Sequence, residues 1–336
     1  MDTLFHSTWQ QALANQITDP KDLFLLLNLP NSLLDAAYAA SKVFPLKTTH
    51  SFVARMRKGD INDPLLLQIL PLGRELEVKA GYAHDPLKEM EANPLPGLLH
   101  KYHGRVLITL TSACAVNCRF CFRRHFPYQE NNPGRRGWEN IFSYIRQDDT
   151  ISEVILSGGD PLSVSDQLLM QFCEQLATIP HVKYLRFHSR LPVVLPQRIT
   201  QTFVDWLRNI KFSVVMVIHM NHANEMNAEV AAALSALRDA GVTLLNQSVL
   251  LKGVNDNIEA LIELSETLFA ANVLPYYLHV LDKVQSVAHF DLPLVEAQAL
   301  HAELINRLPG YLVPKLVRED AGELAKTNVS HGGKNH

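Results

Sequence analysis

The chain has 336 residues, 47% of them hydrophobic, and a formal net charge of -3. Nucleic-acid-binding proteins are usually basic overall, so this balance leads us to expect no nucleic-acid partner. The first residues are polar and the apolar runs are short, so we expect neither a secretory signal nor a membrane span.

Residues 1–100 combine helical patterns with several prolines, and we expect a helical N-terminal region there. Between residues 101 and 310, apolar β-rich runs alternate with amphipathic helical stretches. The predicted strands are Arg105–Thr111, Glu153–Ser157, Val182–His188, Phe212–His219, Val242–Leu250 and Leu274–Val280. The predicted helices lie near 137–147, 165–178, 199–209, 224–240, 257–271 and 293–308. We take Pro196, Asn255 with Asp256, and Pro293 as start signals for the third, fifth and sixth helices.

Apolar strands that are each followed by a helix are typical of a parallel sheet covered by helices. The pattern predicts an α/β fold, a partial (β/α)6 TIM-like barrel with a short C-terminal extension at residues 311–336. A doubly wound sheet has a similar pattern, so the sequence does not decide whether the sheet closes into a barrel. In both folds, polar residues at the C-terminal ends of the strands gather on one rim, where sites are built.

Three of the four cysteines, Cys114, Cys118 and Cys121, form a C-x3-C-x2-C pattern directly after the first predicted strand. Four cysteines, three of them close together, do not form a disulfide framework. They indicate reduced thiols, as in a cytoplasm, and a bound metal. Structural zinc usually takes four protein ligands, whereas three thiolates leave one iron of a four-iron cluster open. We therefore predict a [4Fe-4S] cluster, with a zinc-binding structural site as the weaker alternative. Cys173 lies alone in a helical pattern and is predicted to be core.

This cysteine pattern after a first barrel strand resembles the signature of the radical S-adenosylmethionine (SAM) superfamily. The resemblance implies that the open iron binds SAM and that the reduced cluster cleaves it to a 5′-deoxyadenosyl radical. The turn Ser157, Gly158, Gly159 and Asp160 follows the second strand and resembles the family turn that contacts the SAM amino group. Glycine permits close approach of the backbone to a ligand.

A narrower resemblance, to the lysine 2,3-aminomutase family, is carried by several segments: CRFCFRRHF, ILSGGDPL, PVVLPQRIT, IHMNHANE, NQSVLLKGVND, PYYLHVLD and GYLVP. It implies conversion of L-lysine to β-lysine with SAM and pyridoxal 5′-phosphate (PLP). The bacterial branch that makes (R)-β-lysine for elongation factor P fits best. That branch implies a functional link to elongation factor P and its lysyl ligase, and an electron donor such as flavodoxin or ferredoxin.

The PLP lysine has two candidates near the end of the chain. The family spacing from a G-Y-x-V-P segment, which begins here at Gly310, places it at Lys326. Lys334 follows two glycines and is the alternative. The four glycines that precede the lysine in the family are replaced here by AGELA. Matching positions imply that Tyr102 and Arg105 hold the PLP ring and phosphate.

Substrate contacts follow from the same resemblance. Arg123 matches the arginine that binds the substrate carboxylate, a role suited to a guanidinium fork. Asp282 matches an acid that binds the ε-ammonium group, and Glu319 stands where the family has a second aspartate. His219 and Gln247 match contacts to PLP or SAM. The structural alternatives for these positions are core histidines and solvated charges.

Two other functions stay open. One is a radical SAM aminomutase for another amino acid such as glutamate. Such an enzyme would lack an acidic residue suited to bind a distal ammonium group of the substrate. The other is a non-catalytic protein that uses the cluster as a redox or iron sensor. Binding and cleavage of SAM would distinguish an enzyme from a sensor.

Overall fold

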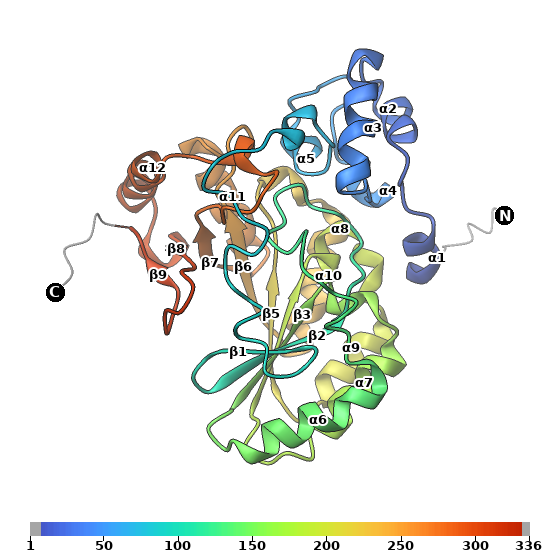
Figure 1. The fold of residues 1–336 in the computed structure, drawn as a ribbon, viewed down its shortest axis with the longest axis vertical. Helices are drawn as coiled ribbons and strands as arrows, with labels where there is room; N and C mark the ends of the chain where they lie inside the picture. Colours follow the sequence, from blue (N-terminus) through green and yellow to red (C-terminus); the bar gives the residue numbers. More distant parts are fainter. Residues whose placement is uncertain (1–7, 331–336) are drawn as a thin grey trace.

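The computed structural model describes residues 8–330 and contains a nine-stranded sheet whose strands follow the chain order (Figure 1). The strands are β1 (Leu98–Tyr102), β2 (Arg105–Thr111), β3 (Glu153–Gly158), β4 (Tyr184–Ser189), β5 (Ser213–Ile218), β6 (Thr243–Val249), β7 (Leu274–His279), β8 (Lys315–Arg318) and β9 (Thr327–Asn328). Strands β2 to β8 are parallel. The edge strands β1 and β9 pair antiparallel with β2 and β8, so the sheet is an open arc and not a closed barrel.

A helix connects each parallel strand to the next. These helices are α6 (Gly134–Gln147), α7 (Asp166–Leu176), α9 (Gln201–Asn209), α10 (Ala228–Asp239), α11 (Ile258–Ala270) and α12 (Leu294–Arg307), with the short α8 (Leu191–Val194) before α9. The predicted α/β fold with six strand–helix units is therefore confirmed. The predicted C-terminal extension contributes a seventh parallel strand, β8. Within residues 8–330, no helix is long and apolar enough to cross a membrane.

Two helices begin within two residues of their predicted starts, but at caps other than the predicted start signals. Thr200 caps α9, and Asn257 caps α11, each by accepting a hydrogen bond from a backbone N–H of the first turn. Pro196 instead begins a 3-10 turn, and the buried side chain of Asn255 binds backbone oxygens of neighbouring loops. The start of α12 after Pro293 agrees with the sequence. A side-chain oxygen at the cap, rather than the nearest proline, decided where these helices begin.

The N-terminal region consists of short helices followed by turns. The helices are α1 (Trp9–Ala14), α2 (Pro20–Leu27), α3 (Leu34–Val43), α4 (His50–Val53) and α5 (Pro64–Leu67). Helices α2 to α5 lie together on the side of the molecule away from α12, and α1 lies apart from them, nearer the N-terminal end of the chain (Figure 1). One buried hydrophobic cluster includes Phe24 and Phe52 of these helices as well as Phe142 and Phe172 of the sheet's outer helices. The predicted boundaries at residues 100 and 310 stay predictions, and β1 spans the first of them.

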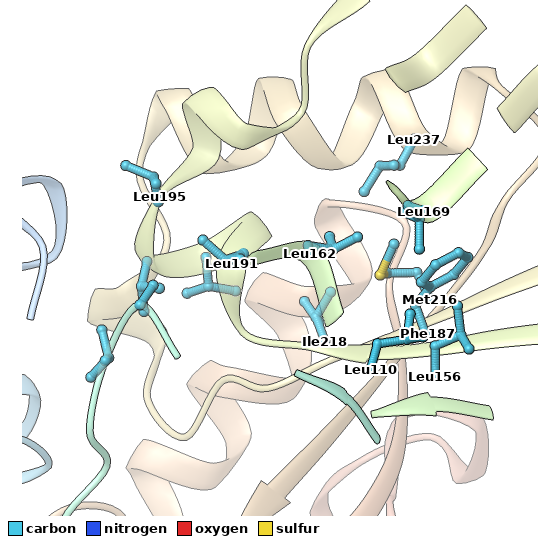
Figure 2. Packing of buried hydrophobic residues seen from close by; sticks show 14 of the residues in the cluster. Leu110, Leu156, Leu162, Leu169, Phe187, Leu191, Leu195, Met216, Ile218 and Leu237 are labelled. Carbon is cyan, nitrogen blue, oxygen red and sulfur yellow. The ribbon is translucent and has the colours of Figure 1, made fainter. Parts of the chain in front are cut away.

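Residue alternation along the strands separates the core from the site. Leu156, Phe187 and Met216 are register neighbours on β3, β4 and β5, and their side chains pack together toward Leu169 of α7 and Leu237 of α10 (Figure 2). Successive side chains of a strand point to opposite faces. The next residues along β3 and β4 therefore face away from the helices, toward the concave side of the sheet.

Candidate active site

A cavity of about 560 Å³ lies along the concave side of the sheet, from Arg105 at the start of β2 to the loops after the parallel strands. Its volume is in the range of small-molecule and cofactor sites. Its wall includes every predicted site residue that the structure describes: Tyr102, Arg105, Cys114, Cys118, Cys121, Arg123, Ser157, Gly158, Gly159, Asp160, His219, Gln247, Asp282, Glu319 and Lys326. Lys334 lies outside the described residues. The fold thus brings residues from opposite ends of the sheet to one space.

The three cysteines lie on the loop after β2, with free thiols. Burial, reinforced by the neighbouring Cys118, raises the pKa of Cys121 to about 11, and burial with the other thiols raises the pKa of Cys114 further. A bound metal centre reverses such shifts because its positive charge stabilises thiolates. Arg190 Nη1 lies 2.7 Å from Cys118 Sγ and adds a positive charge there. Within residues 8–330 no three His, Cys, Asp or Glu side chains are grouped around a single ion position. The donor set fits a cluster, in which each thiolate binds a different iron.

The N-terminal region holds the cysteine loop in place. Arg119 lies between Cys118 and Cys121 in the sequence, is fully buried, and donates from Nε to Glu75 Oε1 at 2.7 Å. Arg124 Nη2 donates to the other oxygen of Glu75 at 2.9 Å. Both guanidinium groups also lie over the ring of Phe44. The sequence assigned no chemistry to residues 1–100, yet they supply the carboxylate on which this loop is anchored.

The two glycines after β3 also serve this loop. Gly158 has φ +104°, which disfavours any other residue, and a Cβ at Gly159 would lie 2.5 Å from the Ala113 oxygen. The Gly159 N–H donates to the Thr111 oxygen and the Asp160 N–H to the Ala113 oxygen, both at 2.8 Å. Close packing on the start of the cysteine loop, and not only approach to a ligand, therefore requires glycine here.

The Asp160 side chain is engaged within the protein. It accepts hydrogen bonds from the Ser189 hydroxyl at 2.7 Å, from the Arg190 N–H at 2.8 Å and from the Leu162 N–H at 3.0 Å. Its carboxylate thereby ties the turn after β3 to the end of β4. The hydrogen bond from the Arg190 N–H to Asp160 also fixes the backbone of Arg190, whose side chain contacts Cys118.

A chain of buried charges lines the side of the cavity near β1 and β8. Arg123 binds both oxygens of Glu89, at 2.6 and 2.7 Å. Lys101 Nζ lies 3.3 Å from Glu89 and 2.9 Å from Glu319, and Lys326 Nζ donates to the other Glu319 oxygen at 2.6 Å. Burial opposes ionisation of Glu319, but Lys326 and Lys101 outweigh it and hold its pKa well below the usual range. Glu319 is therefore an ionised partner of two lysines.

Asp282, just beyond β7, is the exception among these acids. Among residues 8–330, its carboxylate has no hydrogen-bond or ion-pair partner. Burial, reinforced by the nearby Glu319, raises its pKa to about 7. A cation brought into the cavity next to Asp282 would stabilise the ionised form. The position next to Asp282 therefore favours a positively charged group of a ligand.

Two histidines and the β1–β2 hairpin complete the wall of the cavity. His219 stacks on Phe120, and burial with Arg190 nearby lowers its pKa to about 3. Nε2 of His219 and Nε2 of His188 are buried without a hydrogen-bond partner among residues 8–330, so both can bind a ligand. At the β1–β2 hairpin, the Arg105 guanidinium lies 4.7 Å from the centre of the Tyr102 ring. A flat ring beside a cation suits an aromatic, anionic ligand such as a pyridine phosphate.

Sequence reasoning missed several residues of this site, namely Glu75, Glu89, Lys101, His188 and Arg190. The rule that polar residues at the C-terminal ends of parallel strands build sites would have found His188 and Arg190, at the end of β4. No periodic signal singles out Glu75 or Glu89, because both lie in irregular stretches before the sheet.

The comparisons with known proteins agree with this geometry. The model of the radical SAM superfamily matches residues 108–265. The L-lysine 2,3-aminomutase of Escherichia coli is 48% identical over 328 residues, which cover 97% of this chain and 96% of that protein. The chain belongs to the lysine 2,3-aminomutase family. The family's proteins of the same name from Haemophilus influenzae and Clostridium subterminale are 47% and 36% identical, over 95% and 96% of this chain and 94% and 77% of theirs.

Proposed function

We propose that this chain is an L-lysine 2,3-aminomutase, an isomerase that moves the α-amino group of L-lysine to the β-carbon. The observation that carries the proposal is that one cavity contains both Arg123, a guanidinium group with unused donors, and Asp282, a carboxylate without a partner in the described part of the chain. Such a cavity suits an amino acid whose side chain ends in a cation. Membership of the family supports the same reaction.

Three cofactors belong to this proposal. Cys114, Cys118 and Cys121 would hold the [4Fe-4S] cluster, and the turn Ser157, Gly158, Gly159 and Asp160 would lie beside SAM. His219 and Gln247 would contact PLP or SAM. Lys326 would carry PLP, with Tyr102 and Arg105 beside its ring and phosphate. When bound, these groups supply the radical that removes hydrogen from the β-carbon and the carbonyl chemistry that allows the nitrogen to migrate.

The protein's own part is to bind, orient and enclose the substrate. Arg123 would bind the carboxylate of lysine and Asp282 its ε-ammonium group, so that both ends of the substrate are fixed. We assign Glu319 a different role from that implied by the family, because both of its oxygens are engaged by Lys101 and Lys326. Glu319 would keep Lys326 in the cavity and at the edge of the cofactor site. The buried wall excludes water from reactive species.

The wider setting is also a proposal. Family membership and the reduced thiols support an enzyme of the cytoplasm that receives its electron from a flavodoxin or ferredoxin. Its product would be (R)-β-lysine, used by the lysyl ligase that modifies elongation factor P. The similarity to the Escherichia coli and Haemophilus influenzae proteins over nearly the full length of both chains supports this branch.

The deciding experiment is anaerobic reconstitution with iron, sulfide and PLP, followed by reaction with SAM, dithionite and L-lysine. We expect β-lysine by chromatography, and no β-glutamate when L-glutamate replaces lysine. Glutamate would place a carboxylate next to Asp282. Formation of 5′-deoxyadenosine without any β-amino acid from lysine would contradict the proposed function, and β-glutamate as the main product would favour the alternative aminomutase.

A further inference from the structure

The guanidinium group of Arg123 is held on one side by protein partners. Nε and Nη2 donate to the two oxygens of Glu89 at 2.6 and 2.7 Å, and Nη1 donates to the Ser157 hydroxyl at 3.2 Å. A guanidinium group has five N–H donors in one plane. Among residues 8–330, partners use three of these donors, which leaves one on Nη1 and one on Nη2. Since the group is planar and rigid, fixing one edge also fixes the direction of the remaining donors.

Glu89 is itself fixed and buried. Its side chain is 4% exposed, and its backbone N–H donates to the Asp85 carboxylate at 3.0 Å in the turns before β1. Burial opposes its ionisation, but Arg123 and Lys101 lower its pKa below the usual value. Glu89 therefore acts as a rigid, ionised support behind Arg123.

The charges leave this end of the cavity positive. In this connected set of ion pairs, three positive charges (Arg123, Lys101 and Lys326) face two negative charges (Glu89 and Glu319). Glu89 therefore fixes the direction of Arg123 without cancelling the attraction for an incoming anion. A carboxylate that accepts from the two unused donors would complete the set of hydrogen bonds of Arg123.

We propose that Glu89 is a positioning residue that determines specificity for substrates with a free α-carboxylate, by directing the two unused donors of Arg123 into the cavity. This inference rests on the proposed function, since it takes the α-carboxylate of an amino acid as the group that Arg123 binds. Glu89 acts through Arg123 and does not touch the substrate.

An alternative role for Glu89 predicts the opposite change in the affinity for L-lysine. If Glu89 were only a counter-ion, its negative charge would weaken the attraction between Arg123 and a substrate carboxylate. Its neutralisation would then tighten the binding of L-lysine. If Glu89 directs Arg123, its neutralisation removes a bidentate partner, Arg123 turns away, and the binding of L-lysine weakens.

The test compares L-lysine with L-lysinamide, which keeps both amines but lacks the carboxylate. Both ligands are titrated by calorimetry into the reconstituted enzyme without SAM. We expect Glu89→Gln to weaken the binding of L-lysine about tenfold to a hundredfold, the effect of a lost charge-assisted hydrogen bond. The binding of L-lysinamide should change less than about threefold. The matched control is Glu91→Gln, in the same turn, where Glu91 pairs with Lys88 and both side chains are exposed.

Glu89→Asp, which keeps the charge on a shorter side chain, should preserve more of the preference for L-lysine than Glu89→Gln. Tighter or unchanged binding of L-lysine to Glu89→Gln would overturn the inference, as would an equal loss for both ligands, which is the result of a merely structural role. Failure of the proposed function is seen separately. In that case the parent enzyme forms no β-lysine, whatever the two ligands do in Glu89→Gln.

Discussion

Asp282→Asn removes the one carboxylate of the cavity that has no partner among residues 8–330. Its pKa of about 7, compared with 3.8 for an unperturbed aspartate, means that ionisation in the empty cavity is costly. A shift of about three units corresponds to up to about 4 kcal/mol.

The effect on stability depends on pH. The unfolded chain loses the Asp282 proton near pH 4, whereas the folded chain keeps it until about pH 7. The destabilisation therefore grows between these two values and is complete above pH 7. We expect the ligand-free Asp282→Asn variant to melt at a higher temperature than the parent at pH 8, with a smaller difference at pH 5. An equal difference at both pH values would contradict the raised pKa.

The effect on substrate binding has the opposite sign. A bound ε-ammonium group lowers the pKa of Asp282, so L-lysine binding near pH 7 should release protons. With a pKa of about 7, the ionised fraction falls about tenfold from pH 8 to pH 6. We expect calorimetry to show about a tenfold loss of affinity for L-lysine over this range. The control ligand is L-norleucine, which has the same chain without the distal amine.

Two results would refute this reasoning about Asp282. One is an affinity for L-lysine that changes no more between pH 8 and pH 6 than the affinity for L-norleucine. The other is an Asp282→Asn variant that still shows the parent's pH dependence. In the expected case, the variant binds L-lysine about tenfold to a hundredfold more weakly at pH 8, as for a lost charge-assisted hydrogen bond, and its affinity becomes insensitive to pH.

Cys118→Ala should lower bound iron and abolish SAM cleavage, measured by iron analysis and by chromatography of 5′-deoxyadenosine. Cys173→Ala, in the core, should cost about 1 kcal/mol of stability and leave both readouts unchanged. Lys326→Ala should lose the visible absorbance of bound PLP but keep slow SAM cleavage, and full aminomutase activity in this variant would contradict the assignment. Glu75→Gln leaves two buried arginines without their carboxylate, so it should destabilise the protein by about 3–5 kcal/mol and reduce the iron incorporated. The exposed Glu77→Gln is its control, and equal melting temperatures for the two variants would exclude the proposed anchor.

The sequence by itself determined the strand–helix alternation and the cysteine loop, because these depend on local patterns. Apolar runs in β2 to β7 and the spacing of Cys114, Cys118 and Cys121 can be read without knowing what lies nearby. The resemblance to a family added Lys326 and Asp282 by position alone. The structure then placed these residues on one cavity wall. The cysteine loop and Asp282 follow parallel strands, as expected for residues of a site, whereas Lys326 directly precedes the antiparallel strand β9.

Only the tertiary structure decided which charges face one another. Glu89 and Glu75 lie in irregular stretches before the sheet, and no local pattern distinguishes them from solvated acids. Their partners, Arg123 and Arg119, are 34 and 44 residues away in sequence. The contrast between Glu319, held by two lysines, and Asp282, left without a partner, likewise depends on distances that only the folded sheet creates. Pairing and burial set the charge of an acid, and both are properties of the folded chain.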